Sequence, residues 1–351
     1  MKKTPFSCGY TPSFPTLLAQ LKATLLISTY QAGKVVLLSA TEDNRLIQLP
    51  RTFEKPMGIA LHKNKMGIAT KNEVIVLGNV PSLATTYPKK PNTYDGFFVP
   101  RATYYTGQVD IHDLDWGTDG LWAVNTSFSC LVLIDDNYSF VPKWKPHFIT
   151  KLASEDRCHL NGMAMEAGKP TYVTALGKGD TPKSWRTDIT KNGILMHVPS
   201  NEIMVESLAM PHSPRLYKDK LYILLSASGE LIYVDTKTGK YELVLPLNAF
   251  VRGMCIHQDY AFIGTSKLRE NSQSFQQIDR TNKANIAGIL AVHLPSAKIV
   301  GALQYQSSVE EIYDVQLLTN LQRPNILNTL TEDHKLSLST PKNSFWAKSK
   351  D

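Results

Sequence analysis

The stretch HDLDWGTDGLWAVNT, residues 112–126, decides the fold of this chain. It begins with polar residues, continues into a short apolar run, turns at the polar segment GTDG, and ends in a second apolar run. Short runs rich in branched and aromatic residues, separated by Gly, Asp and Asn, are typical of β-strands joined by tight turns. The stretch therefore predicts a β-hairpin whose first strand follows directly on His112.

The same pattern occurs in four further segments: PMGIALHKNKMGIAT, LNGMAMEAGKPTYVTA, HSPRLYKDKLYILLS and RGMCIHQDYAFIGTS. A sixth segment, EEIYDVQLL, begins at residue 310. The five full copies begin at intervals of 56, 49, 51 and 40 residues, counted between Pro56, His112, Asn161, His212 and Arg252. Repeats of this length with about four strands each are the signature of propeller blades. We predict an all-β fold, a single β-propeller with six blades favoured over five.

Residues 28–50 supply further strand patterns and are expected to close the ring together with the C-terminal segment, which removes exposed sheet edges. Residues 13–23 suggest one short amphipathic helix. The predicted organisation is an N-terminal segment with that helix (1–24), the propeller (25–328) and a polar C-terminal tail (329–351).

Composition is that of an ordinary folded protein, with 42% hydrophobic and 20% charged residues. The net charge of +7 comes from Lys and Arg spread along the chain. No basic stripe of the nucleic-acid-binding kind is present in the sequence, so a nucleic-acid partner is not expected.

The four cysteines stand far apart, without metal-binding spacing. The first residues lack the apolar run of a signal peptide, and the run LLAQLKATLLI is broken by Lys22 and too short to span a bilayer. We therefore expect a cytoplasmic protein without a membrane partner.

Polar residues at the beginnings of the inner strands are expected to meet at one end of the propeller channel. His112, Asn161 and His212 come from three consecutive blades and are the predicted metal ligands. Imidazole nitrogen favours zinc or iron over calcium, and manganese is a further candidate. His159, Asp113 and Glu311 are the predicted catalytic residues, as ligand or proton carrier. A metal-free polar pocket and a purely structural hydrogen-bond network are the alternatives.

Arginines at the blade junctions are predicted to hold an anionic group of the substrate, because guanidinium binds carboxylate or phosphate in a bidentate manner. Salt bridges between blades are an equally good explanation for them. The residues concerned are Arg101, Arg157, Arg186, Arg215, Arg252 and Arg269.

A long polar insertion, GKGDTPKSWRTDITKNG, carries Trp185 and Arg186. It is interpreted either as a lid that presents Trp185 to a ligand or as a surface loop held by one Trp. Cys158 next to His159 suggests a thiol nucleophile, but neighbouring strand residues point to opposite faces. No nucleotide-binding motif is present, because the insertion lacks the spacing of a phosphate-binding loop.

Several long segments, among them STYQAGKVVLL, VPRATYYTGQVDIHDLDW, EDRCHLNGMA and FIGTSKLRE, resemble one bacterial family of conserved hypothetical proteins that contain a domain of unknown function. The resemblance extends over residues 13–328. It implies membership of that family and no particular activity.

LNGMAMEAGKPTYVTA is also distantly similar to the metal-ligand blade of gluconolactonase and regucalcin propellers. That similarity implies Asn161 as a metal ligand. The corresponding positions of other blades carry His112, His212 and Arg252 in this chain, in place of oxygen ligands.

The sequence leads to two hypotheses about function. The first is a metal-assisted enzyme that acts at the channel mouth on a polar or anionic small molecule or peptide, with hydrolysis of an ester or lactone as the first reaction class. The second is a non-catalytic propeller that binds a protein, peptide or glycan through the same mouth. Its anchors would be Trp116, Trp185, Arg101 and Arg186.

Overall fold

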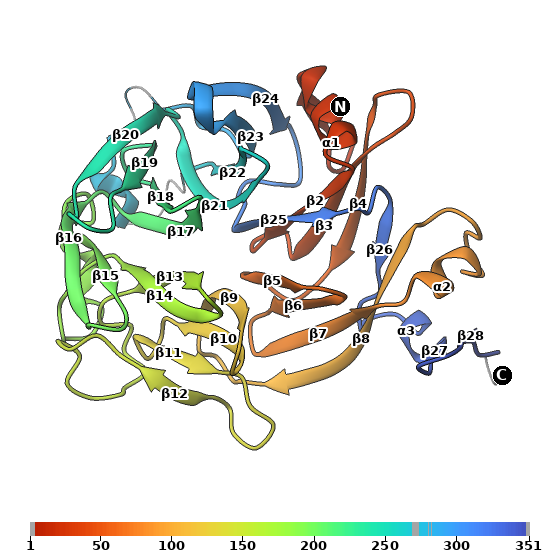
Figure 1. The fold of residues 1–351 in the computed structure, drawn as a ribbon, viewed down its shortest axis with the longest axis horizontal. Helices are drawn as coiled ribbons and strands as arrows, with labels where there is room; N and C mark the ends of the chain where they lie inside the picture. Colours follow the sequence, from red (N-terminus) through yellow and green to blue (C-terminus); the bar gives the residue numbers. More distant parts are fainter. Residues whose placement is uncertain (1–3, 269–273, 280, 282, 349–351) are drawn as a thin grey trace.

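The computed structural model describes residues 4–268, 274–279, 281 and 283–348. Within them, six sheets of four or five strands stand in a ring around a central axis (Figure 1). This confirms the predicted single six-bladed β-propeller. In every blade four antiparallel strands run from an inner strand at the axis to an outer strand at the rim, and the inner strands contact one another around the ring.

In each blade the strands are numbered from the axis outward. Blade 1 contains β25 (Asp314–Thr319), β2 (Ala23–Thr29), β3 (Lys34–Ala40) and β4 (Leu46–Thr52). Blade 2 contains β5 (Ile59–His62), β6 (Lys65–Ala69), β7 (Glu73–Asn79) and β8 (Gly96–Tyr105). Blade 3 contains β9 (Ile111–Gly117), β10 (Gly120–Asn125), β11 (Cys130–Leu133) and β12 (Val141–Trp144).

Blade 4 contains β13 (Leu160–Glu166), β14 (Lys169–Ala175), β15 (Gly193–His197) and β16 (Glu202–Leu208). Blade 5 contains β17 (Pro211–Tyr217), β18 (Lys220–Leu225), β19 (Glu230–Val234) and β20 (Tyr241–Pro246). Blade 6 contains β21 (Phe250–His257), β22 (Tyr260–Ser266), β23 (Gly288–His293), β24 (Lys298–Tyr305) and, at its rim, β1 (Cys8–Tyr10).

The ring is closed in blade 1, where strands from both ends of the chain pair. β25 lies antiparallel to β2, with Ser28 opposite Asp314 and Leu26 opposite Gln316. This is the closure expected from residues 28–50. β1 adds a second link, because it pairs with β24 at the rim of blade 6.

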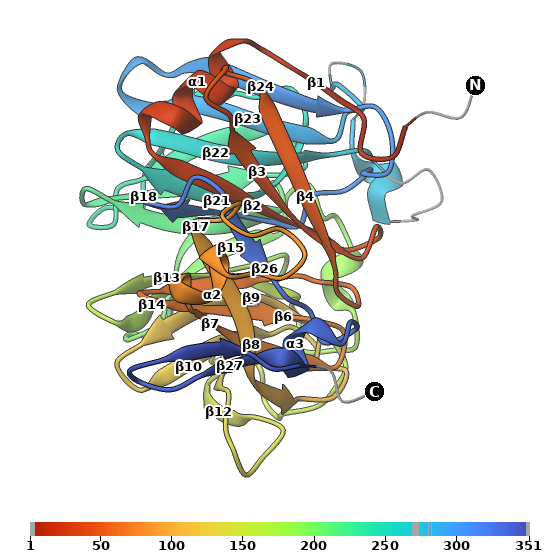
Figure 2. The same cartoon turned by 90° about the vertical axis from the view of Figure 1, so that its right-hand side faces the viewer.

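The N-terminal helix α1 (Ser13–Gln20) lies against blades 6 and 1 (Figure 2). The helix ends at Gln20, three residues before its predicted end at Ala23. The reason is that Lys22 adopts a left-handed conformation with φ of 49° and Ala23 already begins β2. Phe14, Leu17 and Leu18 of α1 are buried, and Phe14 meets Phe262 edge-on.

The segment predicted as a polar tail carries α3 (Asp333–Leu336), β27 (Ser337–Ser339) and β28 (Ser344–Trp346). Before it, β26 (Pro324–Ile326) pairs in parallel with β8. Trp346 packs on Tyr87 and Phe97 near α2 (Pro81–Thr85). Short 3₁₀ turns complete the elements: η1 (Ser184–Arg186), η2 (Ser274–Gln277) and η3 (Leu294–Ser296).

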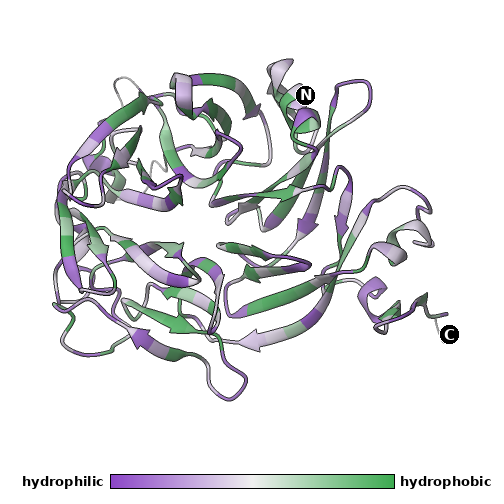
Figure 3. Cartoon of the chain, in the orientation of Figure 1, coloured by the Kyte–Doolittle hydropathy of each residue, from purple (hydrophilic) through white to green (hydrophobic). Residues whose placement is uncertain are grey.

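Apolar residues lie mainly on the strands and polar residues mainly in the turns (Figure 3). One buried cluster lies at each of the six blade interfaces; between blades 6 and 1, for example, Ile27 packs with Phe262. Each fully buried large apolar side chain contributes roughly 1.5–3 kcal/mol relative to an exposed one. The fold is therefore held between blades, which leaves the axis free for polar residues.

The inner strands alternate in chemistry around the axis. One equivalent position near the beginning of each inner strand carries glycine in blades 2, 4 and 6: Gly58, Gly162 and Gly253. In blades 1, 3 and 5 it is Asp314, Asp113 or Ser213, and each accepts a hydrogen bond from the next blade. The donors are the backbone N–H groups of Ile59, Met163 and Gly253, at 2.9, 3.1 and 3.0 Å.

Glycine is required by this close approach. A Cβ on Gly162 would overlap Pro214 and would lie 2.7 Å from Thr174 Oγ1. The alternation therefore couples each pair of blades through one side chain. These contacts also fix the position along the axis of the residue that directly precedes each glycine, aspartate or serine. From blade 2 to blade 6 and then blade 1, the preceding residues are Met57, His112, Asn161, His212, Arg252 and Tyr313.

No helix in the described part of the chain is long and apolar enough to cross a membrane.

Candidate functional site

A pocket of about 220 Å³ lies where several inner strands begin, and we call it the mouth pocket. His112 is the second residue of β9, His212 the second of β17, and Arg252 the third of β21. Seven predicted site residues line the pocket: His112, His159, Trp185, Arg186, His212, Arg252 and Glu311. The structure thus brings together most of the residues expected at the channel mouth.

His112 and His212 have matching surroundings one hundred residues apart. Nδ1 of His112 lies 3.1 Å from the Asp110 carbonyl oxygen and 2.8 Å from Thr126 Oγ1. Nδ1 of His212 lies 3.0 Å from the Met210 carbonyl oxygen and 2.9 Å from Ser226 Oγ. Each hydroxyl stands 14 residues after its histidine and donates to the next blade at 2.6 Å, Thr126 to Leu160 O and Ser226 to Val251 O.

The backbone explains why the carbonyls reach the rings. Asp110 and Met210, two residues before the histidines, have φ of 56° and 54°. In this left-handed conformation the chain turns sharply, and the carbonyl of residue i faces the imidazole of residue i+2. His159 has φ of 52° at the same place in blade 4, two residues before Asn161.

These contacts determine the tautomer of both rings. A carbonyl oxygen only accepts, and each hydroxyl spends its one hydrogen on the next blade, so Nδ1 must carry the proton. Nε2 then holds a lone pair, and among the described residues it has no hydrogen-bond partner. Burial lowers the pKa of His112, and burial followed by the nearby Arg252 lowers the pKa of His212 well below its ordinary value. Both rings are therefore neutral acceptors at physiological pH.

His159 is held by a carboxylate. Its Nδ1 lies 3.0 Å from Asp156 Oδ1, and Asp156 Oδ2 accepts the indole N–H of Trp185 at 2.9 Å. The Trp185 ring packs on His159 at 4.2 Å between centroids, and the His112 ring meets it edge-on at 4.8 Å. Asp156 therefore fixes His159 as the Nδ1–H tautomer with Nε2 directed away from the carboxylate.

Arg252 makes fewer hydrogen bonds than is usual for an arginine whose side chain is largely buried. It pairs with Glu311, and its guanidinium lies 3.9 Å from the centre of the Tyr313 ring. Its Nε is buried without a hydrogen-bond partner, as is the Tyr313 hydroxyl. Arg186 lies at the exposed rim beside Trp185. Nη1 of Arg252 also has no hydrogen-bond partner among the described residues, so the pocket offers guanidinium N–H groups to an anion through the Nη atoms.

Asp113 and Arg215 lie inside the channel instead of lining the mouth pocket. Arg215 Nη1 contacts Asp113 Oδ2 at 3.0 Å and Nη2 lies 3.8 Å from Asp314 Oδ1, while its Nε donates to the Met254 carbonyl. Burial alone would lower the pKa of Arg215, but Asp113 and Asp314 raise it above its ordinary value. We call Asp113, Arg215 and Asp314 the channel network; its bonds explain the position of both predicted residues.

Asn161 bonds through both ends of its amide, once within its own blade and once to blade 5. Its Oδ1 accepts from Thr174 Oγ1 at 2.7 Å, and its Nδ2 donates to the Pro211 carbonyl at 3.1 Å. Asn161 does not line the mouth pocket. In the part of the chain that the structure describes, no three His, Cys, Asp or Glu side chains are grouped closely enough to hold a metal.

Arg157 and Arg101 have structural partners elsewhere. Arg157 is buried between Glu155 and Asp180, at 2.7 and 2.6 Å, and so braces the loop before β13. Arg101 is exposed on β8 and donates to Ser339 of the C-terminal hairpin. Arg269 lies outside the described residues.

Cys158 is fully buried, and burial raises the pKa of its thiol to about 12. A thiol with that pKa stays protonated at neutral pH and is a poor nucleophile. Cys158 is therefore part of the core between blades 3 and 4.

Five residues important to the mouth pocket were not predicted: Asp110, Thr126, Asp156, Ser226 and Tyr313. The sequence does contain a signal for three of them. Tyr313-Asp314 matches His112-Asp113 and His212-Ser213, and a hydroxyl residue stands at the same distance after each histidine.

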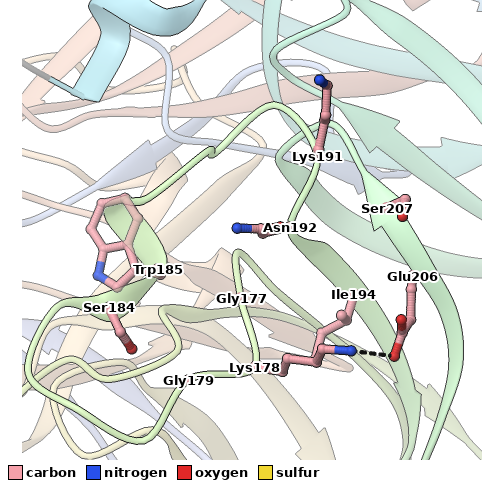
Figure 4. Close-up of a pocket in the computed structure, with 10 residues that line it drawn as sticks. All are labelled: Gly177, Lys178, Gly179, Ser184, Trp185, Lys191, Asn192, Ile194, Glu206 and Ser207. Carbon is pink, nitrogen blue, oxygen red and sulfur yellow. Dashed lines mark hydrogen bonds and ion pairs between the residues drawn. The ribbon is translucent and has the colours of Figure 1, made fainter.

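A second pocket, of about 270 Å³, adjoins the insertion between β14 and β15 (Figure 4). Lys178 and Glu206 form an ion pair of 2.8 Å at its edge. Trp185 lines both pockets and is only 7% exposed, so it holds the loop in place and separates the two spaces. The loop is also tied to blade 6, because Gln277 accepts from Ile189 N–H and donates to Arg186 O.

The fold and the site define a six-bladed β-propeller with a polar pocket at one end of its channel. The chain belongs to the family described as Domain of unknown function (DUF4915), whose model matches residues 12–327. This confirms the family resemblance seen in the sequence.

Among solved structures, a chain in the crystal structure of a nidogen/laminin complex matches with a TM-score of 0.50 and 8% identity, over 85% of this chain and 99% of that one. At this identity the match shows the propeller fold alone. No curated protein matches the sequence. The distant likeness to gluconolactonase propellers stays a prediction.

Proposed function

We propose that this protein is an enzyme acting in the mouth pocket on a small anionic organic molecule, with hydrolysis of an ester or lactone as the reaction. One observation carries the proposal. Three imidazoles, each with Nδ1 engaged and Nε2 without a partner among the described residues, line one pocket together with the partly unpaired guanidinium of Arg252. Polar atoms that converge on one pocket without protein partners are groups to which a ligand can bind.

His159 is the best candidate for the general base. Asp156 orients its Nδ1–H, as a carboxylate does in catalytic triads, and leaves Nε2 to accept a proton. Water would add to the acyl carbon as His159 takes its proton. That proton then passes to the leaving oxygen as the acyl C–O bond breaks. Arg252, paired with Glu311, would hold a carboxylate of the substrate.

A divalent metal remains a prediction for the same pocket. Nε2 of His112 and of His212 suits zinc, iron or manganese, whereas the engaged amide of Asn161 does not fit as the third ligand. We therefore derive no step through a metal. A cytoplasmic location belongs to the same proposal and is supported by the wide spacing of the four cysteines.

The non-catalytic alternative is less well supported. Trp185 is buried and bonded to Asp156, and Trp116 lies at the far end of β9 from His112. Neither presents an exposed aromatic anchor at the mouth pocket, as a binding surface for a protein or glycan would need.

The test is a hydrolysis screen with lactones and esters that carry a free carboxylate, alongside their neutral analogues. Wild-type protein and Asp156→Asn are compared, with Asp119→Asn, a surface carboxylate paired with Lys169, as the matched control. We expect hydrolysis of carboxylated substrates that falls at least 100-fold in Asp156→Asn and is unchanged in the control. Equal rates in Asp156→Asn and wild type would contradict the assignment of His159.

Elemental analysis distinguishes a metal-dependent reaction from one that uses His159 and Asp156 alone. Protein purified without chelator or affinity metal is compared with the His112→Ala/His212→Ala double variant. One equivalent of zinc, iron or manganese that is lost in the variant would support a metal at these imidazoles. Activity in metal-free protein would restrict the mechanism to His159 and Asp156.

A further inference from the structure

The mouth pocket contains two fixed hydrogen-bond acceptors in addition to its guanidinium. His112 and His212 come from alternate blades, and each is 9% exposed or less. Both are locked as Nδ1–H tautomers by a carbonyl and a hydroxyl whose own hydrogen is committed to the next blade. A ring held in this way accepts at Nε2 and cannot donate there without losing two hydrogen bonds.

Leaving two buried acceptors unpaired in a filled pocket is costly. A site built to hydrogen-bond a ligand's hydroxyl groups rejects an analogue without them, because its own polar atoms are then desolvated and unsatisfied. A plain carboxylate offers only acceptors and could satisfy Arg252, but neither histidine. The ligand must therefore supply donors as well as negative charge.

We infer that the mouth pocket selects a hydroxylated organic acid, whose carboxylate meets Arg252 and whose hydroxyl groups donate to Nε2 of His112 and His212. The inference rests on the proposed function, since it names the substrate class of the same site. Thr126 and Ser226 are positioning residues in this arrangement: they touch no ligand and act by fixing the two tautomers.

The structure contains a control for that role. Ser28 in blade 1 donates to the Met57 carbonyl of the next blade at 2.6 Å, the same bond between blades that Thr126 and Ser226 make. It has no imidazole beside it: its other bond is from the Asp314 N–H. Ser28→Ala therefore removes the same link between blades and leaves the histidines untouched.

The experiment uses three four-carbon acids that differ only in hydroxyl groups: succinate with none, malate with one and tartrate with two, all stereoisomers included. Binding to the full chain is measured by calorimetry at pH 7. We expect affinity to rise roughly 2- to 10-fold with each hydroxyl in at least one stereoisomer. The Thr126→Val/Ser226→Ala double variant should lose this preference while retaining succinate binding, and Ser28→Ala should keep it. The Thr126→Ser/Ser226→Ala variant, which has the hydroxyl at position 126 but not the one at 226, should recover part of the preference.

Histidine side-chain ¹⁵N shifts of the same proteins report the tautomers directly. Wild type and Ser28→Ala should show Nε2 unprotonated in both rings, and the double variant should show a growing Nε2–H population. Equal affinity for the three acids, or Nε2–H in the wild type, would overturn the inference while leaving acid binding intact. Equal loss of the preference in Ser28→Ala would overturn the positioning role. Failure of all three acids to bind would contradict both the inference and the anionic ligand of the proposed function.

Discussion

Two arginines near the axis show how differently the channel and its mouth are built. Arg215 donates to two backbone carbonyls of other strands and is paired with Asp113 in the channel network. Arg252 has Glu311 as its charged partner, rests on the Tyr313 ring, and keeps its buried Nε without a partner. Saturated bonds indicate a structural role, and unsaturated bonds at a pocket indicate readiness for a ligand.

The largest expected effect is in the channel. Arg215→Met should destabilise the fold by roughly 3–5 kcal/mol, because it leaves Asp113 and Asp314 buried without their cation. Urea unfolding measures this. Arg101→Met, an exposed arginine on β8, is the control and should change stability by less than about 0.5 kcal/mol. A loss below about 1 kcal/mol for Arg215→Met would remove the structural half of the comparison.

Crowding at the axis gives the next effect. Gly162→Ala should cost about 2–4 kcal/mol, because its Cβ would overlap Pro214 and Thr174. Gly67→Ala is the matched strand control, since its Cβ would stand 3.4 Å from Leu121 in ordinary contact. If both variants unfold at the same urea concentration, the close approach of blades 4 and 5 is not required.

Stability should also depend on pH through the acids around Arg215. Burial raises the pKa of Asp115 to about 6 against the opposing effect of Arg215, and the neighbouring Asp113 contributes to the rise. A carboxyl whose pKa is higher folded than unfolded stabilises the fold fully below about pH 4, and this contribution is lost as pH rises through about 6. Asp115→Asn should remove a decline on the order of 1–2 kcal/mol between about pH 4.5 and 7. Parallel stability curves for the variant and wild type would show that Asp115 does not titrate in this window.

A smaller effect on stability than that of Arg215→Met is expected at the mouth pocket. Arg252→Met should destabilise the fold by about 1–2 kcal/mol, because it takes a cation away from one carboxylate instead of two, and that carboxylate, Glu311, lines a pocket where water can replace the guanidinium. Binding of tartrate should nevertheless fall at least 10-fold in calorimetry. A large loss of stability with unchanged binding would reverse the assignment of the two arginines.

The repeat predicted the fold because each blade restates the same two-strand pattern, and ring closure followed from its length. The beginnings of the repeat copies also placed His112 and His212 at the mouth, where both line the pocket. Tyr313 was missed because blade 1 takes only its inner strand from the C-terminal end, so the two-strand pattern is incomplete there.

Depth along the axis could not be obtained from the sequence. A register shift between His212 and Arg215 sends the arginine into the channel, and regular alternation cannot show such a bulge. Arg157 looked like an anion ligand because its partner Asp180 lies in a different loop. Pairing over such distances depends on the folded ring and is not encoded in local spacing.

The most direct test of the central claim is the protonation of the two mouth imidazoles, followed by NMR of histidine nitrogens in the wild-type protein from pH 5 to 8. The structure predicts that His112 and His212 stay neutral with Nδ1–H and an unprotonated Nε2 at pH 7, and that His212 in particular resists protonation well below pH 6.5. Rings that titrate near pH 6.5, or carry their proton on Nε2, would contradict a mouth pocket that presents two open acceptors to its ligand.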